Sequence, residues 1–162
     1  MEKIEIETGP VAFTSAGITD PKIGPEGKFS LWFLAALALA EGNITLDKFT
    51  DEKVNDPRLT RLRKKINAKL DRRLNLGAKV KVTMKDGTAY EGELATPKGN
   101  PTNPLRPEEI ETKFRDTASL AIPEENIELL IDRIKILEEL SDTNNIMALA
   151  RSTKSVSPDG SG

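Results

Sequence analysis

Apolar and polar residues alternate in two parts of the chain, and such alternation predicts β-strands. Near the N-terminus, Ile4 and Ile6 are separated by an acidic residue, so we predict a short strand with one buried face. The clearest pattern is KVKVTMKDGTAYEGEL, residues 79–94, in which two alternating runs flank Asp86-Gly87. An Asp-Gly pair between such runs is typical of a two-residue type I′ turn, so this segment is predicted to be a β-hairpin.

Two segments in the first half of the chain have helical signals. KFSLWFLAALALAEG, Lys28–Gly42, is apolar on every side and ends on a glycine, which predicts a buried central helix with Gly42 as its C-terminal cap. Asp56-Pro57 is an N-cap residue followed by a proline at the first helical position. We therefore predict a basic helix that continues to Ile66 and has one apolar stripe.

The C-terminal third is predicted to be helical. Pro107–Ala118 begins with acidic residues, which favour the N-terminal end of a helix dipole. A second helix opens at Pro123, with apolar residues at helical spacing, and a short one covers residues 145–150. By contrast, Gly9–Glu26 is rich in Gly, Pro, Ser and Thr and is predicted to be a long loop, which is often functional.

These elements together indicate an α+β fold. Alternation around Ala68 and Leu70 suggests one more strand. Because the clear strand pair is antiparallel and is mixed with helices, we predict a small antiparallel sheet packed with helices rather than a doubly wound parallel sheet. Residues 1–151 are predicted to form one domain, and residues 152–162 to form a flexible tail.

Composition narrows the chemistry that the chain can perform. It has no Cys, which fits a reducing, cytoplasmic compartment, and no His, which removes the usual general base and the commonest metal ligand. Any chemistry must use Lys, Asp, Glu, Ser, Thr, Tyr or Arg, or groups from another chain. The charged start MEKIEIETGP is not a signal peptide, and the longest apolar run, Leu31–Ala40, is too short to span a membrane.

Charge is unevenly distributed along the chain. Residues 57–85 carry basic side chains with a single acidic residue, Asp71, whereas residues 106–142 are mainly acidic. The basic block could contact nucleic acid, but it has few aromatic residues and no known nucleic-acid motif, so we prefer a solvated face or an acidic partner. No spacing of metal ligands and no phosphate-binding loop are present, so we expect neither a metal nor another cofactor.

Two places could bind a ligand. Lys28-Phe29-Ser30 begins the predicted buried helix, and helix starts attract anions through free N–H groups. The other place is the loop TPKGNPTNPL, residues 96–105, whose Lys and Asn side chains present donors on a proline-stiffened backbone. The alternative interpretations are that Ser30 only caps the helix while Lys28 is solvated, and that the loop is only a rigid connector.

Four segments together resemble the C-terminal half of MmgE/PrpD proteins. They are KFSLWFLAALALAEGNITLDKFTDE, DPRLTRLRKKI, VTMKDGTAYEGEL and PKGNPTNPLRPEEIETKFRDTA, and they occur in the family's order and spacing. The resemblance extends from about Ile4 to Leu149.

This resemblance implies a function class. The family includes 2-methylcitrate dehydratase, cis-aconitate decarboxylase and iminodisuccinate epimerase. Its members act on small di- and tricarboxylates by proton abstraction or elimination next to a carboxylate, and they need no metal. It implies a homodimer in which the active site lies between a large all-helical domain and a smaller α+β domain. Only the smaller domain is present here. We therefore expect the helical domain, with its His residues, to come from elsewhere in a longer protein or from a separate polypeptide, and this chain alone to be inactive.

Family roles can be carried over to particular residues. The segment 28–30 corresponds to the family's active-site segment, and the decarboxylase branch has a catalytic His at the place of Phe29 and a Tyr near Gly77, so both departures argue against decarboxylase chemistry. The loop 96–105 corresponds to a family loop near the cleft. The resemblance implies these substrate-binding residues: Lys28, Phe29, Ser30, Lys98, Gly99 and Asn100. The favoured function is a domain of a 2-methylcitrate dehydratase-like lyase or isomerase, and the alternative is a non-catalytic binding or scaffold module.

Overall fold

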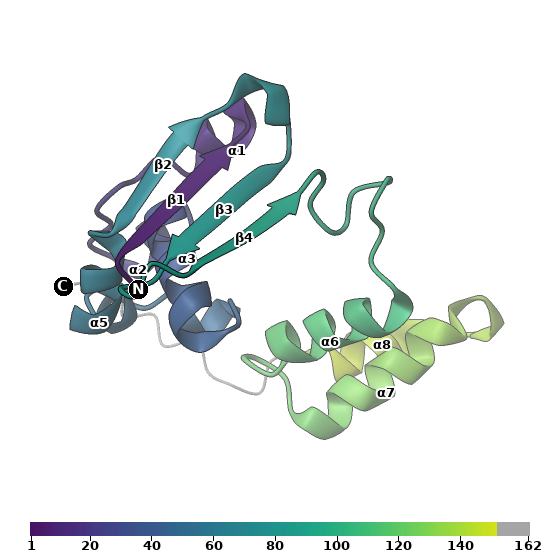
Figure 1. Cartoon of the computed structure of the whole chain (residues 1–162). Coiled ribbons are helices and arrows are strands. Elements are labelled where there is room, and N and C mark those ends of the chain that lie inside the picture. The colour runs from purple at the N-terminus through teal and green to yellow at the C-terminus, as the bar shows by residue number, and fades with distance from the viewer. Residues whose placement is uncertain (152–162) are drawn as a thin grey trace. The chain divides into compact units, whose positions relative to one another are not determined.

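The chain divides into two compact units in the computed structural model, which describes residues 1–151. The first unit is Met1–Leu105, and the second begins at Arg106 (Figure 1). The expectation of a single domain over residues 1–151 stays a prediction. The predicted tail, residues 152–162, lies outside the described residues.

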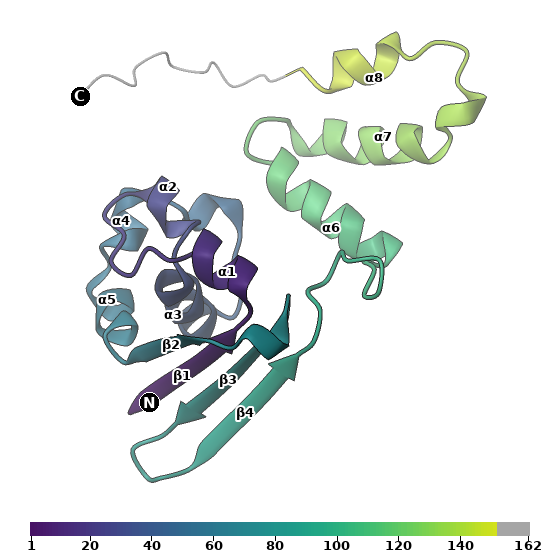
Figure 2. The same cartoon turned by 90° about the horizontal axis from the view of Figure 1, so that it is seen from above.

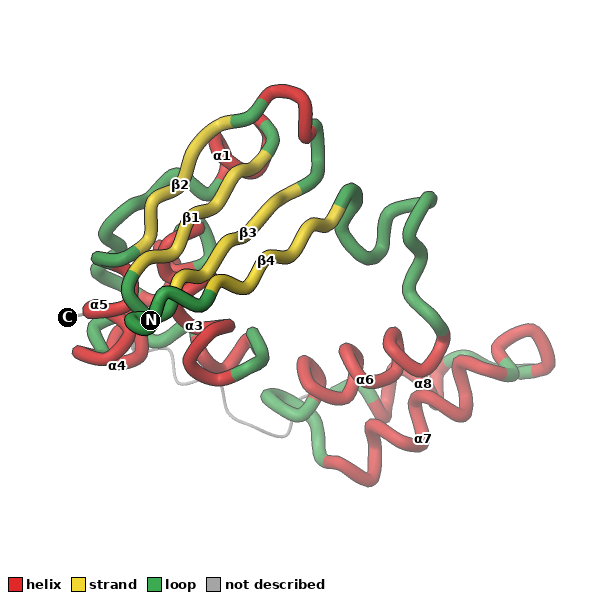
Figure 3. The backbone as a smooth tube through the Cα atoms, in the orientation of Figure 1, coloured by secondary structure: helices red, strands yellow, loops and turns green. Residues whose placement is uncertain are grey.

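The first unit is built on a four-stranded sheet with the order β2-β1-β3-β4 (Figure 3). The strands are β1 (Lys3–Thr8), β2 (Ile66–Leu70), β3 (Ala78–Thr83) and β4 (Ala89–Leu94). Strand β1 pairs parallel with β2 and antiparallel with β3, and β3 pairs antiparallel with β4. The α+β class is confirmed, but the sheet is mixed rather than antiparallel throughout.

Short helices surround one longer helix on one face of this sheet (Figure 2). The longer helix is α3 (Leu31–Glu41), and the short ones are α1 (Pro10–Ser15), α2 (Gly24–Gly27), η1 (Leu46–Lys48), α4 (Asp51–Val54) and α5 (Pro57–Arg63). A further turn, η2 (Arg72–Leu74), connects β2 to β3. The prediction of a continuous loop over Gly9–Glu26 is wrong, because α1 and most of α2 lie inside it. In both helices a proline stands at the start, where its fixed φ suits a helix and its missing N–H costs nothing.

The two predicted helices of this unit exist, with differences at their ends. Gly42 has a φ of 77° and caps α3 as expected. Asp56 caps α5, its carboxylate accepting the Arg58 backbone N–H at 2.7 Å. Helix α5 ends at Arg63 rather than Ile66, since Ile66 already pairs with Ile4 at the start of β2.

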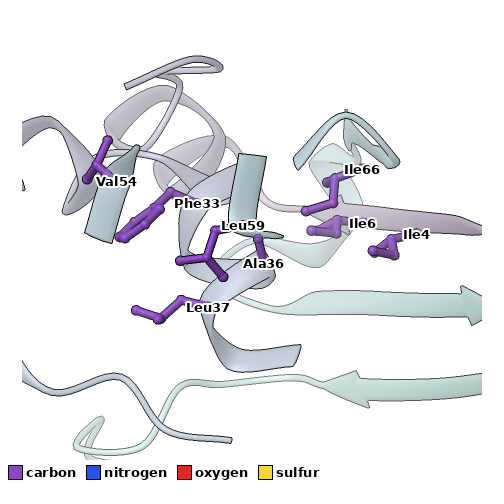
Figure 4. Close-up of a cluster of buried hydrophobic side chains, with 8 residues drawn as sticks. All are labelled: Ile4, Ile6, Phe33, Ala36, Leu37, Val54, Leu59 and Ile66. Atoms are coloured by element: carbon purple, nitrogen blue, oxygen red, sulfur yellow. The ribbon is translucent and has the colours of Figure 1, made fainter. Parts of the chain in front are cut away.

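The core of this unit lies between the sheet and the helical layer (Figure 4). Its buried side chains come from β1, β2, α3, α4 and α5: Ile4, Ile6, Phe33, Ala36, Leu37, Val54, Leu59 and Ile66. Helix α3 contributes the most of them. Its other apolar residues are only partly covered, as Leu39 with 36% exposure shows, so the prediction that α3 is buried on all sides holds only for its inner face.

The hairpin β3–β4 is confirmed, but its turn is not the predicted type I′. A type I′ turn needs positive φ at both central residues, and only Gly87, with a φ of 88°, has it. The Gly87 N–H donates to Met84 O at 3.0 Å, and the Met84 N–H donates to Thr88 O at 2.8 Å. These bonds define a three-residue loop that has the left-handed glycine at its third position.

The second unit is helical, as predicted. It contains α6 (Pro107–Ala118), α7 (Glu124–Lys135), η3 (Leu137–Glu139) and α8 (Asn144–Leu149). Its buried cluster is small, with three members: Ala118, Ile127 and Ile131. In residues 1–151, no helix is long and apolar enough to cross a membrane.

Candidate functional site

The segment Lys28-Phe29-Ser30 forms the junction between α2 and α3. Ser30 is the N-cap of α3: its side chain is fully buried, and its Oγ accepts the Phe33 backbone N–H at 3.0 Å. Such a cap satisfies one of the unpaired N–H groups at a helix start. Ser30 thus caps α3, as the alternative interpretation expected, and its hydroxyl is closed off from solvent.

Lys28 and Phe29 face solvent beside this cap. Phe29 is 55% exposed, and the exposed Lys28 places its Nζ 5.7 Å from the centre of the Phe49 ring. At this distance the ring face attracts the ammonium group and limits its positions. Among the described residues, no carboxylate forms an ion pair with Lys28, so the charge is available to a bound anion.

Backbone pairing holds this junction in place. Residues 16–18 run beside it, and Gly17 forms an isolated antiparallel bridge with Ser30. The Ile18 N–H donates to Phe29 O at 3.0 Å. The exposed side chains of the junction therefore project from a fixed backbone, which lowers the entropy lost when a ligand binds.

The second candidate segment, the loop 96–105, is a compact turn held by its own side chains. Gly99 has a φ of 89°, and its N–H donates to Asn103 O at 2.9 Å. The Asn100 Oδ1 accepts from the Thr102 hydroxyl at 3.1 Å, and Asn103 Nδ2 donates to Thr96 O at 2.9 Å. The asparagines therefore shape the loop, while Lys98 lies exposed on it.

The two candidate segments do not meet. The α2–α3 junction belongs to the helical layer, whereas the loop 96–105 leaves the end of β4, an edge strand. Figures 1 and 2 show the helical layer and this loop well apart in both views. Substrate binding by either segment stays a prediction.

A buried cation beside the junction was not singled out in the sequence. Arg63 is 6% exposed and donates to Asp20 Oδ1 at 3.2 Å and to Pro21 O at 3.3 Å, at a shallow hollow of about 340 Å³. The pKa of Asp20 is lowered, mainly by its hydrogen bond from Lys22 and also by Arg63. In the sequence, Arg63 is one cation in a basic run, and no local pattern marks it as the buried one.

Four other cations of the basic block, Arg58, Arg73, Lys79 and Lys81, form ion pairs with carboxylates. Lys81 Nζ lies 2.7 Å from Glu91 Oε1, and Arg73 Nη2 lies 2.7 Å from Asp71 Oδ2. Pairing of this kind favours a solvated face over a surface for phosphates. The described residues contain no group of three or more metal-ligating side chains.

These features define a class of protein: an α+β domain that presents an exposed lysine at a helix start held by backbone pairing. The chain belongs to the MmgE/PrpD family, because residues 1–136 match the MmgE/PrpD C-terminal domain. The resemblance stated above is thereby confirmed, and the matched range includes the strands, α6 and α7.

Similar proteins of known activity share this part of the chain. It is 28% identical to the cis-aconitate decarboxylase of Mus musculus over 93% of this chain and 32% of the relative. It is 30% identical to the human cis-aconitate decarboxylase over 78% of this chain and 27% of that relative. A third relative is the mitochondrial 2-methylcitrate dehydratase of Yarrowia lipolytica, with 32% identity over 36% of this chain and 13% of the enzyme. The chain spans about a third or less of the length of these relatives.

Proposed function

We propose that the chain is the smaller domain of an MmgE/PrpD-type lyase or isomerase that acts on small di- or tricarboxylates. Membership of the family supports this, as do the names of the relatives, which are decarboxylases of cis-aconitate and a dehydratase of 2-methylcitrate. An all-helical domain would complete the active site. It would also supply the general base, because this chain has no His.

The observation that carries the proposal is the ammonium group of Lys28 at a fixed helix start, with which no carboxylate in the described part of the chain forms an ion pair. A carboxylate would bind there through a charge-assisted hydrogen bond, which is stronger than a neutral one. Phe29 would contact the carbon chain of the substrate. Ser30 would act by holding both neighbours in position, since its own hydroxyl is buried.

The loop 96–105 would contribute a second edge of the site. Asn100 Oδ1 is taken by Thr102, which leaves the Asn100 Nδ2 group to donate to a ligand. Lys98 would add a second positive charge, and the left-handed Gly99 would let the backbone approach the ligand closely.

Exposed apolar side chains in the second unit support the need for a further domain. They lie on α6, α7, η3 and α8 and include Ile110 with 54% exposure, Ile134 with 51% and Met147 with 67%. Large apolar side chains that stay exposed are available to pack against a further domain. We propose that the all-helical domain covers them, and that the assembled enzyme is a homodimer.

The first experiment identifies what completes the site. The tagged chain would be recovered from its native extract, and the proteins that accompany it identified by mass spectrometry. We expect an all-helical, His-containing polypeptide, and the complex should turn over 2-methylcitrate, citrate or cis-aconitate. Recovery of the chain alone, without activity on any of the three, would favour the alternative of a non-catalytic scaffold. Because Phe29 replaces the decarboxylase His, we expect dehydration or isomerisation products and no release of CO₂.

Lys28→Ala in the assembled enzyme is the sharpest single test. Loss of a charged hydrogen bond to the substrate should lower kcat/KM by roughly 10- to 100-fold. Lys85→Ala is the matched control, because Lys85 is an exposed lysine in the hairpin turn, away from α2. Equal kinetics for the wild type and both variants would refute the role of Lys28.

A further inference from the structure

The outer face of the sheet carries columns of alternating charge. Each of three neighbouring strands presents two side chains of one sign: Glu5 and Glu7 on β1, Lys79 and Lys81 on β3, and Glu91 and Glu93 on β4. Lys81 Nζ lies 2.7 Å from Glu91 Oε1, and Lys79 Nζ lies 3.3 Å from Glu93 Oε2. These six side chains line a shallow hollow of about 460 Å³. The acidic column of β4 is the last, and it has a basic neighbour on one side only.

The backbone of β4 is also unsatisfied on its outer side. The Met84 N–H donates to Thr88 O, so these two residues form a hydrogen-bonded pair. Along an antiparallel ladder, hydrogen-bonded pairs alternate with pairs whose backbone groups point away from each other, and the next pair is Thr83 with Ala89. The backbone groups of Ala89, Glu91 and Glu93 therefore point away from β3. No described strand pairs with them.

The inner face of β4 is uncovered as well. Tyr90 is 63% exposed and Leu94 is 51% exposed, and a Cβ added at Gly92 would meet nothing within 4 Å. Their neighbours on β3, Val80 and Val82, pack against the core. Figure 2 shows why: α1 to α5 lie over the half of the sheet that contains β1 and β2, and β4 lies on the far side.

We propose that the β4 edge binds an extended segment of a partner protein in which two Lys or Arg residues alternate with apolar residues. The segment would add a fifth strand, pair with the open backbone groups and cover Tyr90 and Leu94 with its apolar side chains. Its basic residues would continue the charge alternation beside Glu91 and Glu93. Cross-strand pairs of opposite charge stabilise a sheet, and like charges directly opposite destabilise it.

Charge also excludes a second copy of this chain as the occupant. Pairing β4 with β4 would set Glu91 and Glu93 against the same residues of the other copy. The other edge of the sheet, β2, is partly closed, because the Trp32 Nε1–H donates to Ile66 O at 3.2 Å. Along a strand, the backbone groups of successive residues point alternately to one neighbouring strand and to the other. The Ile4 N–H donates to Lys65 O, so Lys65 points toward β1 and Ile66 O points to the outer edge of β2. Charge therefore disfavours pairing of β4 with β4, and the occupied Ile66 O disfavours pairing of β4 with β2.

The probe is a blocked peptide that contains AKVKVT, the sequence of β3, because β3 already pairs with β4 through this pattern. It would be titrated into the ¹⁵N-labelled full chain at low salt, with amide shifts and hydrogen exchange read by NMR. We expect shifts and slower exchange at Ala89, Glu91 and Glu93. The charge-reversed peptide AEVEVT should bind at least about tenfold more weakly, and salt should weaken the AKVKVT complex.

Two controls separate strand pairing from simple charge attraction. An AKVKVT peptide with N-methyl groups on alternate amides keeps its charge but cannot complete the ladder, so it should lose binding. The variant E91K/E93K should reverse the preference between the two charged peptides, and its hairpin amides would report whether it folds.

Four results would overturn the proposal: no shifts at millimolar peptide, equal binding of both charged peptides, shifts at β2 in place of β4, or self-association of the chain through β4. The first would mean that the two glutamates only protect an exposed edge from aggregation. None of these results depends on the carboxylate chemistry of the junction.

Discussion

At the scale of single residues, the α2–α3 junction depends on the hydroxyl of Ser30. The Ser30 Oγ accepts the Phe33 backbone N–H in the first turn of α3, and Ser30 lies beside the proposed carboxylate contact. Ser30→Ala should lower the free energy of unfolding by about 1–2 kcal/mol, the usual cost of a lost N-cap, as measured by urea denaturation.

Thr45→Ala is the control for this variant. Thr45 also precedes a helical turn, η1, but its side chain makes no capping hydrogen bond. Its replacement should change the free energy of unfolding by no more than about 0.5 kcal/mol. If both variants had the same stability, the cap would have no special role in fixing the junction.

Asp71 should make stability depend on pH. Its carboxylate is bonded first by the Arg73 side chain and then by the Arg73 backbone N–H, and these bonds lower its pKa from 3.8 to about 2. Between these values the unfolded chain binds more protons than the folded chain, so stability rises with pH there. The contribution is present above pH 3.8 and is lost as the pH falls toward 2.

The variant Asp71→Asn isolates this effect. The difference in unfolding free energy between wild type and variant should be constant near neutral pH and should shrink as the pH falls below 3.8. Urea denaturation across that range measures it. A difference that stayed constant down to pH 2 would show that the Arg73 contacts do not act through the charge of Asp71.

At the scale of elements, two glycines of the hairpin should respond in opposite ways. Gly87 has a φ of 88° and Gly92 is in regular β4, and a Cβ would meet no atom within 4 Å at either. Gly87→Ala should cost about 1–2 kcal/mol through backbone strain alone. Gly92→Ala should be neutral or should stabilise by up to about 1 kcal/mol, because it removes freedom from the unfolded chain. Thermal unfolding of both variants tests this, and a stability loss only at Gly92 would contradict it.

Elements with a regular period or a capping residue could be predicted from the sequence. This holds for β1, the β3–β4 hairpin, α6 with its exact bounds, and the cap residues Gly42 and Asp56. Helices α1 and α2 were missed because four to six residues are too few to show a helical period. Their Pro10 and Pro25 were available signals.

The remaining errors have a tertiary cause. Helix α5 ends early because Ile66 pairs with Ile4 of β1 in the sheet. The local sequence around Ile66 gives no sign of this pairing, because Ile4 is distant in the sequence. The candidate site shows the same limit. The sequence could place Ser30 at a helix start, but only the packing of α3 shows that its hydroxyl is buried and that Lys28 lies over Phe49.

At the scale of the whole molecule, the two units should differ in their ability to fold alone. The first has a cluster of eight buried core residues and a four-stranded sheet, whereas the second buries four apolar side chains, three of them in one cluster. Units of fewer than about 60 residues with so small a core are marginal. A fragment of residues 1–105 should therefore unfold cooperatively, and a fragment of residues 106–151 should not.

Circular dichroism and amide shift dispersion of the two fragments would check this. Leu59→Ala should destabilise the first fragment by about 2–5 kcal/mol, which would show that its core is the one described. Cooperative unfolding of the second fragment alone would contradict the prediction, and would weaken the case that an additional domain must cover its apolar side chains.

The strand order of the sheet also determines how long β1 waits for its pairing partners during synthesis. Strand β1 is synthesised first but lies in the middle of the sheet, between β2 and β3, which are made much later. At roughly 5–20 residues per second of synthesis, β1 would leave the ribosome seconds before either neighbour exists. During that interval its alternating KIEIET sequence has two open edges, and its two acidic residues, Glu5 and Glu7, would disfavour pairing with other chains.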